Sequence, residues 1–253
     1  MNILEKILNV KRQEIQQIED MEFGEMVGQI RSLKDALSKP GISVIAEIKM
    51  KSPSEGEIFS YADPAQIAKG YESAGAAAIS VLTDQFFFGG SLDILKSVRD
   101  AVSIPVIRKD FIIDQKQISE TIHYNGDAFL LIADALDQDS LQQLMNIGEM
   151  AGLEFLVEYH AEKHAEYIFA LNPEIVGINC RNLKTMATDI TYFEKMISSL
   201  PSNSVKVAES GIHTSDDLEY VSDLGYDAAL IGTSLMKTGN PEKALETLLG
   251  EIS

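Results

Sequence analysis

The sequence has very little cysteine and no tryptophan. Its one cysteine, Cys180, has no second thiol in the chain with which to form a disulfide. A single thiol fits a reducing compartment, so we expect a cytoplasmic location. No apolar run approaches the ~20 residues of a membrane-spanning helix, and the charged, helix-like start of the chain does not resemble a secretory signal. We therefore expect no association with a membrane.

Basic residues are also scarce. The 253 residues include 21 Lys and Arg against 39 Asp and Glu, which gives a net charge of −18. Such a surface repels nucleic acid and anionic lipid, so we expect neither as a partner. If the ligand is itself an anion, the few basic residues must be concentrated where it binds.

Motifs for metal binding and for nucleophilic catalysis are missing. The histidines are scattered, and none belongs to a motif such as HExxH: His123, His160, His164 and His213. No Ser-His-Asp arrangement can be assembled. Cys180 alternates with Asn179 and Arg181 along an extended segment, so we interpret it as a packing residue. We therefore expect no metal site.

What the chain does contain is a regular alternation of short apolar runs with amphipathic, helix-length segments. The apolar runs lie at 43–48, 77–82, 104–108, 128–132, 153–157, 174–178, 204–208 and 227–231. Several intervening segments begin with a residue that commonly caps a helix: Asp63, Ser91, Asp114, Asp137 and Thr214. Strands joined by helices are parallel, because parallel pairing needs a crossover connection.

Eight strand–helix repeats in about 210 residues favour an α/β fold of the closed (β/α)₈, or TIM barrel, type. An open, doubly wound sheet is the alternative, weakened by the absence of GxGxxG after the first strand. We expect one domain over 1–253, with helices at about 3–20 and 23–38 in an N-terminal extension (1–41) and the barrel over 42–253. The extension would act as a lid or as a plug for the barrel.

Charged and polar residues stand where the predicted strands end. In a barrel these ends meet at one rim, where active sites lie. Side chains two residues apart share a face of a strand, so Glu47 and Lys49 would point the same way. The charged and amide side chains at the predicted rim are Glu47, Lys49, Arg108, Lys109, Asp110, Glu158, Asn179, Arg181 and Glu209.

The last two strands end differently, in small residues. Ser210-Gly211 and Gly232-Thr233-Ser234 offer backbone N–H groups of the kind that bind phosphate in many barrels. Ser52 and Ser54 could reach the same anion. Phe88 puts an aromatic ring near the rim. The pattern indicates acid–base catalysis by Lys and Glu on a small, anionic, phosphorylated and carboxylated substrate. A barrel that binds such a ligand without catalysis is the alternative.

Seven segments together resemble the signature blocks of the indole-3-glycerol phosphate synthase family, in family order from about residue 43 onward. They are VIAEIKMKSPSEG, ISVLTDQFFFGGSLDIL, PVIRKDFIIDQKQI, FLVEYH, VGINCRNLKT, VAESGI and ALIGTSLM. The resemblance implies a lyase of tryptophan biosynthesis that needs no metal or organic cofactor. It would convert 1-(2-carboxyphenylamino)-1-deoxyribulose 5-phosphate to indole-3-glycerol phosphate, CO₂ and water.

The resemblance also implies roles for individual residues. Lys109 matches the general acid of ring closure, and Lys49 matches the lysine that holds the substrate carboxylate and shares acid duty in the later dehydration. Glu158 matches the general base of that dehydration. Glu47, Glu209 and Asn179 complete the implied catalytic set. The implied substrate contacts are Arg181, Ser210, Phe88 and Leu131, and the implied phosphate site is Ser52, Gly211, Gly232 and Thr233.

Three positions depart from the family pattern: Met50 where Arg is frequent, Thr233 where Ser or Glu is frequent, and Cys180 in Asn-Cys-Arg. Met50 points away from Lys49 by strand alternation, so we expect little loss. The nearest related alternative is phosphoribosylanthranilate isomerase, which would be expected to carry a catalytic cysteine early in the barrel. The sequence leaves the oligomeric state open, and a monomer is compatible with it.

Overall fold

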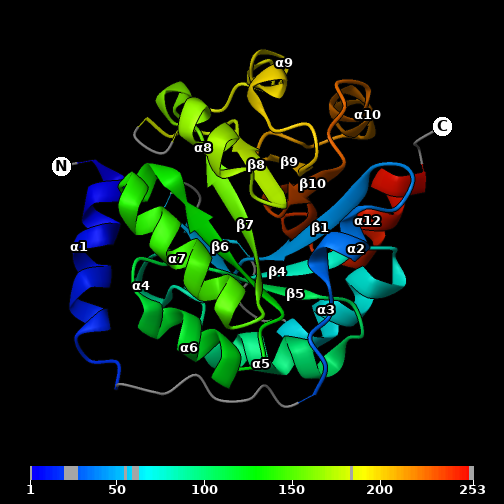
Figure 1. Ribbon diagram of the computed structural model, residues 1–253. Coiled ribbons are helices and arrows are strands. Elements are labelled where there is room, and N and C mark those ends of the chain that lie inside the picture. The colour runs from blue at the N-terminus through cyan, green and yellow to red at the C-terminus, as the bar shows by residue number, and fades with distance from the viewer. Residues whose placement is uncertain (1, 20–27, 54–55, 59–62, 183–184, 251–253) are drawn as a thin grey trace.

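A computed structural model describes residues 2–19, 28–53, 56–58, 63–182 and 185–250 of the chain (Figure 1). Its strands form one closed parallel barrel in the order β1-β10-β9-β8-β7-β6-β5-β4, which confirms the predicted barrel and excludes the open sheet. Each strand lies within two residues of its predicted range. The barrel strands are β1 (Ser43–Ile48), β4 (Ala78–Leu82), β5 (Val106–Lys109), β6 (Ala128–Ile132), β7 (Glu154–Tyr159), β8 (Ile175–Asn179), β9 (Val205–Glu209) and β10 (Ala228–Ile231).

The strands are apolar throughout because both of their faces are buried. Ile45 of β1 faces the barrel interior, whereas its neighbours Val44 and Ala46 face the surrounding helices. The register closes the barrel at this strand, since β1 pairs with β10 through Ser43 and with β4 through Ile45. Alternation therefore divides the core into an interior layer and an outer layer.

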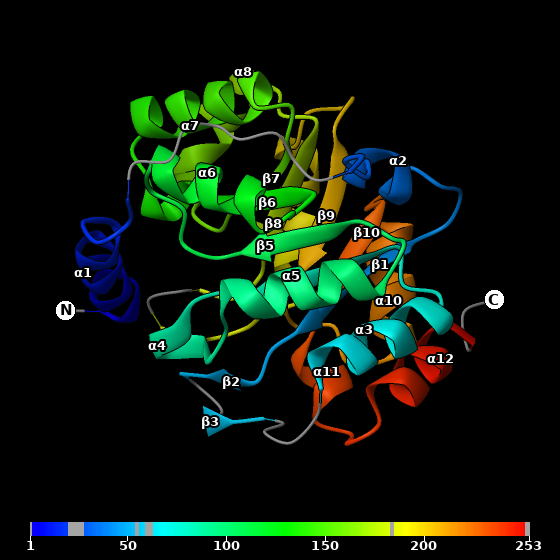
Figure 2. The ribbon, with the colours of Figure 1, turned by 90° about the horizontal axis from the view of Figure 1, so that it is seen from below.

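Helices surround the strands, as Figures 1 and 2 show. The helices that follow the barrel strands are α4 (Gln85–Phe88), α5 (Leu92–Ala101), α6 (Gln115–His123), α7 (Gln138–Met150), α8 (Ala165–Leu171), α9 (Tyr192–Met196), α10 (Ser215–Asp223), α11 (Thr233–Met236) and α12 (Pro241–Gly250), and α3 (Pro64–Ser73) follows the first connection. Among the described residues, three 3₁₀ helices lie in the connections: η1 (Ala133–Ala135), η2 (Glu162–His164) and η3 (Ile197–Ser199). A small antiparallel ribbon, β2 (Lys51–Ser52) with β3 (Gly56–Glu57), follows β1.

The predicted helix caps are all confirmed. In each case the side-chain oxygen accepts a backbone N–H of the first turn, which satisfies a donor that the helix itself leaves unpaired. The capping residues are Asp63, Ser91, Asp114, Asp137 and Thr214. These signals are local in the sequence, which is why they could be recognised there.

The N-terminal extension differs from the prediction. Its first helix, α1 (Ile3–Ile15), is present but ends before residue 20. The second helix, expected over 23–38, is confined to α2 (Leu33–Leu37); residues 28–32 are not helical, and 23–27 lie outside the described residues. The reason is tertiary: the Arg31 N–H donates to Asp127 at 3.0 Å, and the Ser32 hydroxyl donates to Glu154 at 2.7 Å.

The two extension helices lie at opposite ends of the barrel (Figure 2). Leu33 and Leu37 of α2 join the interior layer beside the first residues of the strands, so this helix closes the N-terminal end. Leu4, Ile7 and Leu8 of α1 reach the same interior layer near the strands' C-terminal ends. The extension therefore supplies both a plug and part of the rim.

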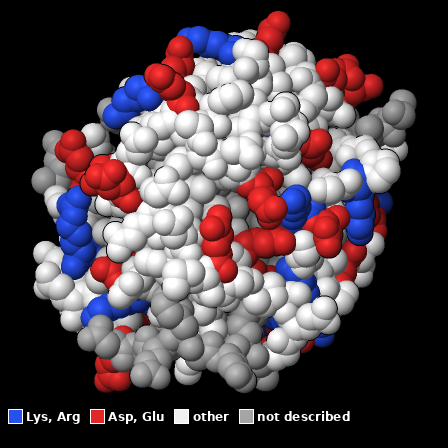
Figure 3. Space-filling view, viewed as in Figure 1, with Lys and Arg blue, Asp and Glu red and all other residues white. Residues whose placement is uncertain are grey.

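None of the helices in the described part of the chain is both long and apolar enough to cross a membrane. Carboxylates are spread over the face drawn in Figure 3, with the less numerous basic side chains of this acidic chain interspersed among them.

Candidate active site

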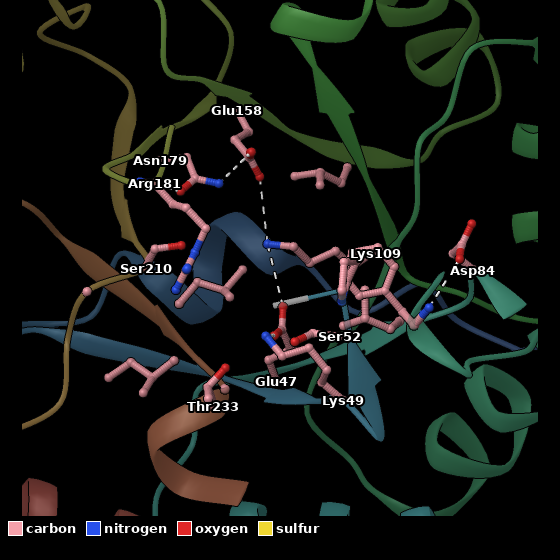
Figure 4. A pocket seen from close by; sticks show the side chains of 18 of the residues that line it. Glu47, Lys49, Ser52, Asp84, Lys109, Glu158, Asn179, Arg181, Ser210 and Thr233 are labelled. Atoms are coloured by element: carbon pink, nitrogen blue, oxygen red, sulfur yellow. Dashed lines mark hydrogen bonds and ion pairs between the residues drawn. The ribbon is translucent and has the colours of Figure 1, made fainter. Parts of the chain in front are cut away.

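A cavity opens at the C-terminal ends of the barrel strands (Figure 4). Most of the polar residues expected at the rim line it, although they come from six different strands or the loops after them. They are Glu47, Lys49, Ser52, Lys109, Glu158, Asn179, Arg181, Ser210, Gly211, Gly232 and Thr233. Glu209 lies beneath this surface, fully buried, with its carboxylate directed at Lys109.

Lys109, the last residue of β5, occupies the centre of the cavity. Its Nζ lies 2.9 Å from Glu209, 3.6 Å from Glu47 and 3.7 Å from Glu158. Burial alone would lower the pKa of Lys109, but the carboxylates of Glu209, Glu158 and Glu47 raise it above its ordinary value. The side chain is therefore held as an ammonium ion, which is a proton donor.

Glu47 and Lys49 leave the same face of β1, as alternation predicted, and form an ion pair of 2.5 Å. Burial raises the pKa of Glu47, yet Lys49 and Lys109 outweigh it and hold that pKa below the usual value. Glu47 is thus an anion placed between two cations. Gly232 makes room for it, because a Cβ there would lie 2.5 Å from Glu47 Oε1.

Glu158 is held by hydrogen bonds from the end of the neighbouring strand. Asn179 Nδ2 donates to Glu158 Oε1 at 2.8 Å, and the Arg181 N–H donates to Asn179 Oδ1 at 3.0 Å. His160, directly after β7, also contributes: its Nδ1 lies 2.8 Å from the Asn179 carbonyl oxygen, which makes that nitrogen a donor. This network orients one carboxylate oxygen and leaves the other facing Lys109.

Glu209 has a carboxyl group whose pKa is shifted upward, opposite to the shift of Glu47. Burial and the neighbouring Glu158 raise its pKa to about 8, although Lys109 opposes the shift. Gly177 on β8 makes room for it, since a Cβ at that position would lie 2.3 Å from Glu209 Oε1. The site can therefore hold a proton on Glu209 near neutral pH in addition to the proton of Lys109.

The rest of the cavity has an apolar side and an end made of small residues. On the apolar side the Phe88 ring tilts toward the Phe111 ring, with centroids 6.3 Å apart. At the other end, Ser210 and Gly211 have positive φ angles of 70° and 74°, and Thr233 begins α11. Backbone N–H groups at a helix start have no partner within the helix and favour an anion. The cavity suits an elongated ligand with an aromatic part and an anionic part.

Leu131 does not belong to this site. It is fully buried in the outer layer between the strands and the helices, whereas Leu130 and Ile132 line the cavity. Neighbouring residues of a strand face opposite ways, so a position off by one moves a side chain to the other layer. The assignment of Leu131 to substrate binding is therefore wrong.

Sequence reasoning also missed residues that look like ordinary core in the sequence. They include five apolar residues that line the cavity: Leu82, Phe111, Leu130, Ile132 and Leu230. It missed Asp84 as well, which follows β4, lines the cavity and caps α4. The available signal was the position of Asp84 just after a predicted strand and two residues before the run Phe86-Phe87-Phe88. Ser54 lies outside the described residues.

Two of the positions that depart from the family pattern are packing residues. Met50 packs against the outer layer of the core. Cys180 is buried, its thiol donates to the Ser210 carbonyl at 3.3 Å, and burial raises its pKa to about 12. A thiol in that state is a poor nucleophile. Among the residues that the structure describes, no three His, Cys, Asp or Glu side chains are grouped so as to hold a metal ion.

Several known proteins are similar to this chain in sequence. A family profile described as "Indole-3-glycerol phosphate synthase" matches residues 4–248. The indole-3-glycerol phosphate synthase of Halalkalibacterium halodurans is 43% identical over 98% of this chain and 97% of its own length. The enzyme of Geobacillus sp. is 45% identical over 99% of this chain and 98% of its own length. The enzyme of Mycolicibacterium gilvum is 47% identical over 85% of this chain and 79% of its own length.

A more distant likeness concerns the fold alone. Thiamine phosphate pyrophosphorylase from Pyrococcus furiosus superimposes with a TM-score of 0.62 at 15% sequence identity, over 87% of this chain and 96% of that one.

Proposed function

The chain belongs to the indole-3-glycerol phosphate synthase family, and on this premise we propose that its cavity closes the indole ring in tryptophan biosynthesis. The substrate is 1-(2-carboxyphenylamino)-1-deoxyribulose 5-phosphate, and the products are indole-3-glycerol phosphate, CO₂ and water. The observation that carries the assignment of roles is the ammonium group of Lys109, fixed among the carboxyl groups of Glu47, Glu158 and Glu209 at the centre of the cavity.

The substrate's two ends match the two ends of the cavity. Its phosphate would lie on the small-residue loops, held by Gly211, Gly232, Thr233 and Ser52. The anthranilate ring would pack on the apolar side against Phe88, with Leu130 and Ile132 in place of Leu131. Two anionic groups would then be bound by a protein of net charge −18 at the point where Lys49, Lys109 and Arg181 gather.

Ring closure needs a proton on the ketone oxygen while an aromatic carbon attacks the ketone carbon. Lys109 supplies that proton as the general acid, because its carboxylate neighbours keep it protonated and in place. Lys49 pairs with the substrate carboxylate until CO₂ leaves and the aromatic ring is restored. Glu47, already bound to both lysines, keeps them apart and oriented.

Dehydration then removes the hydroxyl that ring closure made. Glu158 acts as the general base, positioned by Asn179, while Lys49 shares the acid role for the departing hydroxyl. Arg181 and Ser210 hold the anilino-sugar part of the substrate. Glu209 tunes Lys109 through their contact. A lysine thus donates a proton in each step, and Glu158 accepts one in the second.

We assign the chain to one domain, with residues 1–41 as an extension that completes the barrel of 42–253. Contacts from α1 and α2 into the interior layer support that unit. The single cysteine supports a cytoplasmic location.

The direct test is to add the substrate to the purified protein and follow indole fluorescence. The chain has no tryptophan, so its own emission contributes little background. We expect a steady rise in fluorescence, and a much lower kcat/KM for the substrate without its phosphate.

Two alternatives predict other results. A non-catalytic binder would bind the substrate without forming an indole product. A phosphoribosylanthranilate isomerase would instead consume phosphoribosylanthranilate. Either result from folded protein would contradict the proposal.

A further inference from the structure

The N-terminal helix α1 carries a lysine where its amphipathic pattern calls for an apolar residue. Leu4, Ile7, Leu8 and Lys11 form one face at helical spacing, and all four are buried. Lys11 is only 4% exposed. A buried ammonium group is costly unless it is paired, so its partners must explain its presence.

Those partners come from the rim of the barrel. Lys11 Nζ lies 2.9 Å from Asp110 Oδ1 and 3.1 Å from Asp84 Oδ2, and both aspartates are almost wholly buried. Glu14, on the same helix, is a third partner at 2.7 Å and is partly exposed. A single cation from α1 therefore joins the residues that follow β4 and β5.

Asp110 directly follows Lys109 and shapes the backbone there. Its Oδ1 accepts the Phe111 N–H at 2.8 Å, and its Oδ2 accepts the Thr83 hydroxyl at 2.7 Å. The side chain thus fixes the turn at the end of β5 and ties it to the end of β4. The direction in which Lys109 enters the cavity depends on this turn.

Asp84 does the same for the apolar side of the cavity. Its Oδ1 accepts the Phe87 N–H at 2.7 Å and the Phe88 N–H at 3.3 Å, which caps α4. Its other oxygen faces Lys11. Lys11 is therefore linked to two segments of the rim. Through Asp110 it contacts the turn that orients Lys109, and through Asp84 it contacts the segment that positions the Phe88 ring.

We propose that Lys11 is a positioning residue for the reaction: it bridges Asp84 and Asp110 and so holds Lys109 and Phe88 in register. This inference rests on the proposed function. Lys11 does not line the cavity and acts only through the two aspartates. Burial lowers the pKa of Lys11, but Asp110 and Asp84 raise it above its ordinary value, so the bridge is charged.

Loss of the ammonium group would leave two carboxylates side by side in a buried place. Asp110 would keep Arg108, whose Nη2 lies 3.3 Å away. Within the described part of the chain Asp84 pairs with no other cation, so its carboxylate would be left buried without a counter-ion. Repulsion between the two carboxylates would weaken the cap of α4 and loosen the turn after Lys109.

The test compares Lys11→Met with Lys11→Arg and with Lys6→Met. Lys6 is an exposed lysine on the same helix, so Lys6→Met makes the same chemical change without touching the bridge. We expect Lys11→Met to lower kcat about 10- to 100-fold, with a smaller rise in KM. Lys11→Arg should recover most of that loss, and Lys6→Met should behave like the wild type.

Thermal unfolding of each variant separates positioning from loss of structure. If Lys11→Met does not fold, Lys11→Gln, which keeps most of the stem, takes its place with the same expectation. A kcat equal to that of the wild type in either folded variant overturns the proposal, as does a loss that Lys11→Arg fails to recover. A wild-type protein that makes no indole product would instead overturn the proposed function, so the two failures are distinguishable.

Discussion

Lys109 and Glu209 are 100 residues apart in the chain, yet their side chains meet at 2.9 Å beneath the cavity. The contact joins the end of β5 to the end of β9 across the barrel. It opposes the effect of burial on both groups, because the anion favours the protonated lysine and the lysine favours the ionised carboxylate. The number of protons that Lys109 and Glu209 hold at a given pH therefore depends on this contact.

The first prediction concerns Lys109 itself. We expect Lys109→Ala to lower kcat by about 10²- to 10⁴-fold, because a general acid contributes about that much, while substrate binding persists through the phosphate loops. A continuous assay that follows the fluorescence of the indole product measures the rate. Lys96→Ala is the control, since Lys96 is exposed on α5 and pairs only with Asp100 in the described part of the chain. An unchanged rate in Lys109→Ala would remove its assigned role.

The second prediction concerns stability against pH. The carboxyl group of a glutamate has an ordinary pKa of 4.5, and that of Glu209 is raised to about 8 in the folded protein. Between these values the native state holds a proton that the unfolded state has released. The free energy of unfolding should therefore fall as pH rises through that window, by up to about 1.4 kcal/mol per pH unit from this group.

Glu209→Gln should remove that part of the pH dependence, because glutamine does not titrate. Urea unfolding at several pH values measures it. Glu149→Gln changes an exposed glutamate on α7 and should keep the wild-type slope. Parallel slopes for the wild type and Glu209→Gln would mean that Glu209 ionises normally.

The third prediction uses a glycine that the site requires. We expect Gly177→Ala to displace Glu209, since the new Cβ would lie 2.3 Å from its Oε1. Overpacking of this kind costs about 1–3 kcal/mol, and kcat should fall because Lys109 loses its partner. Gly250→Ala is the matched control, as its Cβ would meet open space. Wild-type kcat in Gly177→Ala would show that the position of Glu209 is unimportant.

The fourth prediction separates two neighbouring leucines. Leu130→Ala and Leu131→Ala should each lower the free energy of unfolding by about 2–5 kcal/mol, because both remove buried methyl groups. Only Leu130→Ala should also raise KM, since Leu130 lines the cavity and Leu131 packs in the outer layer. Steady-state kinetics and urea unfolding of the pair measure both effects. If Leu131→Ala raised KM and Leu130→Ala did not, Leu131 would be a substrate contact after all.

Features encoded locally were predictable from the sequence. The caps at Asp63 and Ser91 depend on contacts within one helical turn, and the pairing of faces at Glu47 and Lys49 depends only on strand alternation. The order of the strand-end residues placed most of the rim. The second extension helix was mispredicted because Arg31 and Ser32 bond to Asp127 and Glu154, which are about 100 residues or more away in the chain.

The sequence by itself therefore determined the barrel, its caps and the polar character of its rim, since each follows from residues near one another in the chain. Only the tertiary structure decided that the pKa of Glu209 is raised, which layer Leu131 occupies and which carboxylates Lys11 binds. Those properties depend on distances of about 3 Å between side chains from different strands and helices, and on burial that removes water from between them. Neither the distances nor the burial can be derived from the spacing of residues along the chain.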